Sequence, residues 1–193
     1  MLQFEEEGHV YQWDGKVVPS VTQIIEPLSL YAGIPQDILD NAARRGQYVH
    51  KLCELDMAGM LDEDDVDEAN AGYLTAWRTF MGTAGFEPYL NEIRMYHEKL
   101  GYAGTPDLVM LKKGKPALID IKCTSSFIPT VGPQTAAYSE LLHACHGIQP
   151  WRRYCLRLMN NGMFELKALE NQSDIATFRS CLNIWRWRND YGE

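Results

Sequence analysis

A predicted β-hairpin in the middle of the chain constrains the fold more than any other sequence feature. Residues 108–121 read LVMLKKGKPALIDI, in which apolar runs flank the polar stretch Lys112-Lys113-Gly114-Lys115. This pattern is typical of two strands joined by a tight turn. If the turn is centred on Lys113-Gly114, paired residues have numbers that add up to 227. Asp107 then lies opposite Asp120, with the two side chains roughly 4.5–5.5 Å apart.

The two aspartates predict a cation between them. Like charges directly across a ladder destabilise a sheet and raise the pKa of one carboxyl group, unless a positive charge lies close to both. Lys122 follows Asp120 by two residues, so both side chains project from the same face of the strand. The three residues therefore indicate a metal site with an ammonium group beside it.

Four short elements resemble those of a known nuclease superfamily. Pro106-Asp107 and Asp120-Ile121-Lys122 resemble the signature of the PD-(D/E)XK nucleases, an acid at one strand end followed by acid-any-Lys on the next strand. Gly46-Gln47-Tyr48-Val49-His50 is similar to the upstream Gly-x-x-x-His element of the RecB-like, phage-type exonuclease branch. Gln134-Thr135-Ala136-Ala137-Tyr138 is similar to its downstream Gln-x-x-x-Tyr element. Their order and spacing also agree with that branch.

The resemblance implies both a fold and an activity. The fold is an α/β, restriction-endonuclease-like core, a mixed central sheet with helices on both faces in the order α-β-β-β-α-β. The activity is that of a DNA exonuclease of recombination, repair or replication, which hydrolyses phosphodiesters with a water activated by Mg²⁺ or Mn²⁺. Expected partners are DNA ends, further copies of the chain in a homo-oligomer, and a single-strand annealing or binding protein.

Three other functions stay open. One is a catalytically inactive DNA-binding or regulatory module of the same fold, although such a module has no need of opposed carboxylates. The second is an endonuclease. The third is a metal hydrolase for small phosphoesters, which would leave Gln134 and Tyr138 unexplained.

Each predicted catalytic group has a distinct chemical role. Asp107 and Asp120 are hard oxygen ligands of the kind that Mg²⁺ prefers. Lys122 is a point charge suited to holding the attacking water or the charge that develops on the phosphate. The resemblance alone implies that the carbonyl oxygen of Ile121 is a further metal ligand.

His50 lies on a predicted helix, and the resemblance implies that it contacts a metal. Imidazole suits Mn²⁺ better than Mg²⁺. We therefore expect Mn²⁺ affinity to weaken as the pH falls through roughly 6.5, where an unperturbed histidine gains a proton. Glu54, four residues further on, could orient the imidazole or reach a second metal through water, or be an ordinary exposed glutamate. Glu92, in the strand before Asp107, is a further candidate acid.

Gln134 and Tyr138 share one face of a helix that Pro133 opens. An amide and a phenol placed in this way can bond the DNA backbone or base edges. The alternative is a polar residue near the helix start followed by a core tyrosine.

Composition favours one domain over residues 1–193, with 1–34 as an N-terminal extension and 35–193 as the nuclease core. The chain is 46% hydrophobic and 23% charged, enough to bury a core. A net charge of −8 argues against a generally basic nucleic-acid binder, but much of the acidity lies in 61–68, which we expect to be a solvated loop.

We expect no membrane association and a cytoplasmic location in a bacterium or a phage-infected cell. No apolar run approaches the roughly 20 residues of a membrane span, and the N-terminus is acidic where a signal peptide would be basic and then apolar. No two of the five cysteines lie closer than ten residues, so we expect neither disulfides nor the iron–sulfur cluster that some RecB-like nucleases carry.

The remaining periodicity predicts a mixed order of helices and strands. We expect a hairpin over 9–18, helices over 21–26, 35–60, 67–81, 133–146 and 172–188, and strands over 88–97, 102–111, 116–123, 151–159 and 163–168.

Overall fold

A five-stranded mixed sheet organises the computed structural model, which describes residues 1–6, 8–31 and 33–191. Its strand order is β10-β9-β8-β7-β4, and β8 and β9 are its parallel pair. The strands are β4 (Glu87–Asn91), β7 (Leu108–Lys112), β8 (Lys115–Lys122), β9 (Arg152–Leu158) and β10 (Phe164–Ala168). A parallel pair needs a long crossover, which α4 (Val131–His146) supplies.

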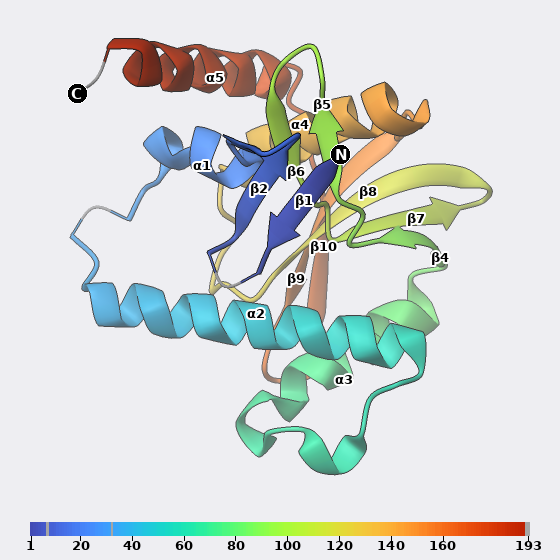
Figure 1. Cartoon of the computed structure of the whole chain (residues 1–193). Helices are drawn as coiled ribbons and strands as arrows, with labels where there is room; N and C mark the ends of the chain where they lie inside the picture. Colours follow the sequence, from blue (N-terminus) through green and yellow to red (C-terminus); the bar gives the residue numbers. More distant parts are fainter. Residues whose placement is uncertain (7, 32, 192–193) are drawn as a thin grey trace.

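Helices cover both faces of this sheet (Figure 1). The helices α2 (Gln36–Ala58) and α3 (Ala71–Thr83) pack on one face, while α1 (Val21–Ile24), α4 and α5 (Asp174–Tyr191) pack on the other. Strands β7 and β8 supply apolar residues to both cores because their side chains alternate. The order α2-β4-β7-β8-α4-β9 is the expected α-β-β-β-α-β order, so the predicted fold class is confirmed.

The β7–β8 hairpin has the predicted register. Leu108 pairs with Ile119 and Val109 with Leu118. Lys113 and Gly114 form the turn with φ angles of +53° and +71°, the left-handed values that a two-residue type I′ turn requires. Asp107 directly precedes β7 and therefore lies at the strand end opposite Asp120.

Two predicted strands are each divided in two. The prediction over 102–111 was wrong in its middle, because Pro106 has no N–H to donate to a ladder. Residues Tyr102–Gly104 form β6, which pairs in a small separate sheet with β5 (Met95–His97). The prediction over 88–97 breaks at Glu92, whose φ of +47° turns the chain out of β4.

The N-terminal region holds one more strand than predicted. Strand β1 (Leu2–Glu5) joins the predicted hairpin of β2 (Val10–Trp13) and β3 (Lys16–Val18) in a three-stranded sheet. A 3-10 turn, η1 (Glu26–Leu28), follows α1.

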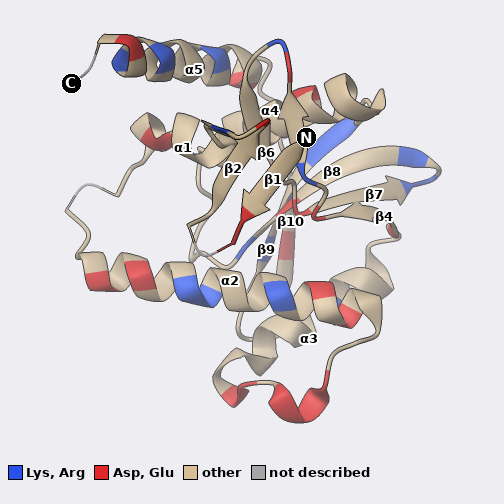
Figure 2. Ribbon diagram, viewed as in Figure 1, with Lys and Arg blue, Asp and Glu red and all other residues tan. Residues whose placement is uncertain are grey.

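The acidic segment at 61–68 is largely exposed beside α3, as expected (Figure 2). It contains the 3-10 turn η2 (Glu63–Asp65), and Asp67 caps a second one, η3 (Glu68–Asn70). The helix predicted from residue 67 therefore begins at Ala71. Across residues 1–6, 8–31 and 33–191, no helix is long and apolar enough to cross a membrane.

Candidate metal centre

His50, Glu92 and Asp107 meet at the end of the sheet. His50 projects from α2, Glu92 follows β4, and Asp107 precedes β7. One possible ligand atom from each residue lies within 4.8 Å of the other two. The two acids are neighbours because β4 pairs with β7 and the Glu92 N–H donates a 3.2 Å hydrogen bond to the Asp107 carbonyl oxygen. Three elements distant in sequence thus converge on one point.

The His50 imidazole bridges two oxygens at this point. Its Nε2 lies 3.0 Å from the carbonyl oxygen of Ile121, and its Nδ1 lies 3.4 Å from Asp107 Oδ1. Burial lowers the pKa of His50, but the Asp107 carboxylate more than offsets it and brings the pKa to about 9. Near neutral pH the metal-free protein therefore holds an imidazolium ion, which supplies the positive charge between the two oxygens.

The Asp107 carboxylate is fixed in place by the neighbouring strand. Its Oδ2 accepts a 2.7 Å hydrogen bond from the backbone N–H of Ile121. The charge of His50 and this hydrogen bond hold the pKa of Asp107 below its ordinary value, although burial acts in the opposite direction. Asp107 is therefore an ionised ligand candidate over the whole neutral range.

A small cavity of about 10 Å³ adjoins these groups. This is about the volume that one water-sized species occupies. His50, Glu54, Glu92, Asp107 and Ile121 are among its lining residues. His50 offers an imidazole nitrogen, the three acids offer carboxylate oxygens, and Ile121 offers a carbonyl oxygen. Mn²⁺ and Mg²⁺ accept ligands of these types. The residues present therefore fit one divalent cation.

Asp120 and Lys122 form a separate pair beside this group. The Asp120 side chain is 2% exposed, and its Oδ2 lies 2.7 Å from Lys122 Nζ. Its Oδ1 has no hydrogen-bond partner among the described residues. Burial raises the pKa of Asp120 to about 6, and Asp107 adds to this rise while Lys122 opposes it. Burial lowers the pKa of Lys122, but Asp120 and Asp107 outweigh it, so the side chain stays an ammonium.

The sequence predicts Asp107 and Asp120 as a facing pair of metal ligands. The structure instead brings Asp107 to His50 and Glu92, whereas Asp120 contacts Lys122. The two aspartates are still close enough for Asp107 to raise the pKa of Asp120. A role for Asp120 as a direct ligand stays a prediction.

Glu92 occupies a more central place than its sequence signal suggested. The left-handed φ of +47° is a costly conformation for a residue with a side chain, and such strain often occurs at functional sites. Partial burial raises the pKa of Glu92 to about 7, and the charge of Asp107 adds to this rise. No local sequence pattern marks this place, because Glu92 reaches Asp107 through the antiparallel pairing of β4 with β7. Glu54 lines the same cavity, but its carboxylate is 2.9 Å from Lys51 Nζ.

Tyr138 is a core residue with its hydroxyl turned toward Gln134. The residue is 5% exposed, and its hydroxyl accepts a 3.3 Å hydrogen bond from Gln134 Nε2. A Cβ added to Gly104 would lie 2.7 Å from Tyr138 Cε1, so this close approach requires glycine there. DNA contact by this pair stays a prediction, and Gln134 is the more exposed of the two.

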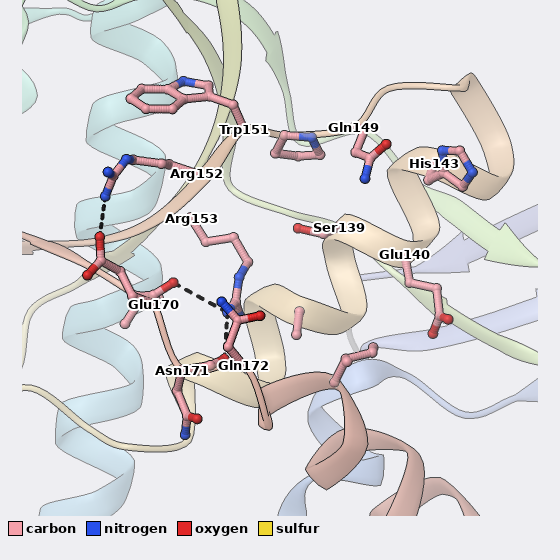
Figure 3. Close-up of a pocket in the computed structure, with 14 residues that line it drawn as sticks. Ser139, Glu140, His143, Gln149, Trp151, Arg152, Arg153, Glu170, Asn171 and Gln172 are labelled. Carbon is pink, nitrogen blue, oxygen red and sulfur yellow. Dashed lines mark hydrogen bonds and ion pairs between the residues drawn. The ribbon is translucent and has the colours of Figure 1, made fainter.

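A much larger cavity lies away from these groups. It has a volume of about 860 Å³ and opens between α4, the start of β9 and residues 169–175 (Figure 3). Its charged side chains are already paired, Arg152 with Glu170 and Arg153 with Asp174. Among the residues that the structure describes, the histidine and acids that could hold a metal gather at His50 instead.

Comparison with known proteins gives structural matches alone. No family model matches the sequence, and no curated protein matches it. The solved structure of LHK-Exo in complex with dAMP is 14% identical, with a TM-score of 0.48 over 90% of this chain and 88% of that chain. An alkaline exonuclease (LHK-Exo) from Laribacter hongkongensis is 15% identical, with a TM-score of 0.43 over 89% and 87%. A candidate exonuclease from Eubacterium rectale is 13% identical, with a TM-score of 0.49 over 79% and 69%. At these low values, function has to be inferred from the residues of the site.

Proposed function

We propose that this protein is a metal-dependent deoxyribonuclease of exonuclease type that uses Mg²⁺ or Mn²⁺. The observation that carries the proposal is the cavity of about 10 Å³ bordered by donor groups of His50, Glu92, Asp107 and Ile121. The ion-paired Asp120 and Lys122 lie next to this group. Clustered buried acids destabilise a fold unless positive charge offsets them, and the raised pKa values of Asp120 and Glu92 indicate that His50 and Lys122 do not offset them fully.

A divalent cation held there would polarise phosphate oxygens and lower the pKa of a coordinated water. Asp107 brings a negative charge to the cavity, and Glu92 brings a second one when it loses its proton. His50 has to give up its extra proton to become a ligand. Lys122 keeps its proton and therefore acts as a fixed positive group, not as a base. It can hold the oxygen of an attacking water or the charge that develops on the phosphate. Asp120 keeps the Lys122 ammonium in place, 2.7 Å away.

The substrate and partners follow from the resemblance of the sequence motifs. DNA ends are the proposed substrate, and Gln134 with Tyr138 is the proposed DNA contact. Assembly into an oligomer and cooperation with a single-strand annealing protein are further predictions of the same kind.

The test is cleavage of end-labelled linear DNA, single- and double-stranded, and of a covalently closed circle. Each substrate is incubated with Mg²⁺, Mn²⁺ or a chelator. We expect metal-dependent release of nucleotides from linear DNA and no cutting of the circle. Cutting of the circle would indicate an endonuclease, and binding without cleavage under every condition would refute nuclease activity.

Two matched carboxylate variants locate the activity within the molecule. Asp107→Asn should abolish cleavage because it removes a ligand from the proposed metal centre. Glu170→Gln, which changes an acid at the larger cavity, should leave cleavage unchanged. Dependence on Glu170 and not on Asp107 would show that the site has been assigned to the wrong end of the fold.

A further inference from the structure

The N-terminal sheet is joined to the segment that carries Asp107. The N–H of Ala103 in β6 donates a 2.9 Å hydrogen bond to the carbonyl oxygen of Pro19, and Ser20 forms a parallel bridge with Ala103. Strand β6 leads directly into Thr105-Pro106-Asp107. The N-terminal region thus fixes the strand from which the Asp107 segment starts.

Tyr11 of β2 makes a second connection, closer to the site. The residue is 1% exposed, and its hydroxyl lies 2.7 Å from Thr105 Oγ1. Thr105 is separated from Asp107 by Pro106 alone, and the proline ring fixes the backbone φ angle there. Pro106 therefore removes one of the backbone rotations that could absorb a shift of Thr105 before it reaches Asp107.

The same sheet also contacts the segment that follows Glu92. Trp13 stacks on Tyr96 with ring centroids 4.5 Å apart and an interplanar angle of 21°, and the Arg94 guanidinium lies 4.6 Å from the centre of the Phe4 ring. Burial raises the pKa of the Tyr11 phenol, and the nearby Glu92 charge contributes to this rise. The N-terminal sheet therefore touches both chain segments that bring acids to the cavity.

We propose that Tyr11 is a positioning residue of the metal centre. Its hydroxyl holds Thr105, and through it the Asp107 carboxylate, at the spacing from Glu92 and His50 that a divalent cation requires. The region expected to be an extension of the nuclease core is, on this view, part of the site. The inference rests on the proposed function, because it takes Asp107 as a metal ligand.

The test is calorimetric titration of Mn²⁺ into the parent protein and the variants Tyr11→Phe and Thr105→Val, which remove the same contact from opposite sides. Loss of one buried hydrogen bond should weaken Mn²⁺ binding by about threefold to tenfold in each variant. The double variant should bind no more weakly than either single one, because the contact can be lost once only. The turnover number for DNA cleavage should fall, with the KM for DNA unchanged.

Tyr102→Phe is the matched control. Tyr102 is fully buried in β6, but its hydroxyl lies 3.2 Å from both the Ala137 carbonyl oxygen and a Glu140 carboxylate oxygen, on the α4 side. This variant should lose at least as much stability as Tyr11→Phe and keep the parental Mn²⁺ affinity.

The outcomes separate this inference from the proposed function. If folded Tyr11→Phe binds Mn²⁺ as tightly as the parent protein, Tyr11 is an ordinary core residue. The same follows if Tyr102→Phe loses as much Mn²⁺ affinity as Tyr11→Phe. Both conclusions hold even if the parent protein cleaves DNA. If Tyr11→Phe does not fold, Thr105→Val decides by the same criterion. A parent protein that neither binds Mn²⁺ nor cleaves DNA would refute the proposed function and this inference together.

Discussion

Replacement of Asp120 by asparagine should stabilise the metal-free protein. The Asp120 carboxyl group is 2% exposed, and burial together with the charge of Asp107 raises its pKa to about 6 from an ordinary value of 3.8. The favourable contact with Lys122 is already included in that value, since it acts in the opposite direction. The ionised carboxylate is therefore a net cost to the folded state, and an amide of nearly the same shape removes that cost.

The magnitude and its pH dependence follow from linkage. The difference between the two pKa values corresponds to about 3 kcal/mol of folding free energy when the group is fully ionised. Because the folded-state pKa is the higher one, the cost is absent below about pH 4, grows between about pH 4 and 6, and is complete above that range. The advantage of Asp120→Asn should therefore be close to zero at about pH 4 and on the order of 3 kcal/mol at about pH 8.

Thermal unfolding in the presence of a chelator measures this effect. For a chain of this size the expected gain corresponds to a rise in Tm of about 6–12 °C at about pH 8. The same variant should lose metal-dependent cleavage, so the gain in stability and the loss of activity come from one substitution. A Tm at or below the parental value at about pH 8 would show that the Asp120 carboxylate is not under electrostatic strain in the folded protein.

Three further predictions concern the neighbouring groups. Lys122→Ala should abolish cleavage, while the Mn²⁺ affinity measured by calorimetry should change only a few fold. Cleavage at the parental rate would show that Lys122 does not stabilise the attacking water or the charge on the phosphate. Parental Mn²⁺ affinity should fall about tenfold per pH unit between about pH 9 and 7, and not just below 6.5 as the sequence predicts, because metal must displace the proton of His50. His50→Ala should remove the dependence in this range, above the pKa of about 7 of Glu92, and its persistence there would exclude His50 as a ligand. Glu92→Gln should weaken Mn²⁺ binding more than Glu54→Gln, and the reverse order would place the ion elsewhere.

The central hairpin could be predicted because its signals are local. Alternating apolar residues and the Lys113-Gly114 turn define β7, β8 and their register within a short stretch of sequence. That register places Asp107 and Asp120 at one end of the sheet. The helix predicted over 133–146 corresponds to α4, and Pro133 lies in its first turn.

Other features depend on pairings between distant segments, which no local pattern reveals. The position of Glu92 beside Asp107 arises from the antiparallel pairing of β4 with β7. The contact of Tyr11 with Thr105 joins residues 94 positions apart. The raised pKa of His50 depends on burial and on Asp107 together, and neither is visible in the motif.

One divalent cation should bind between His50, Glu92, Asp107 and the Ile121 carbonyl oxygen. Anomalous diffraction from crystals soaked in Mn²⁺ can locate this ion, with Asp107→Asn crystals as the control. We predict an anomalous peak in the parent at coordination distance from the His50 imidazole and the Asp107 carboxylate, and no peak there in the variant. A parent without a peak at this position, or with its Mn²⁺ peak at the larger cavity near Glu170, would show that the metal centre is not formed by these residues.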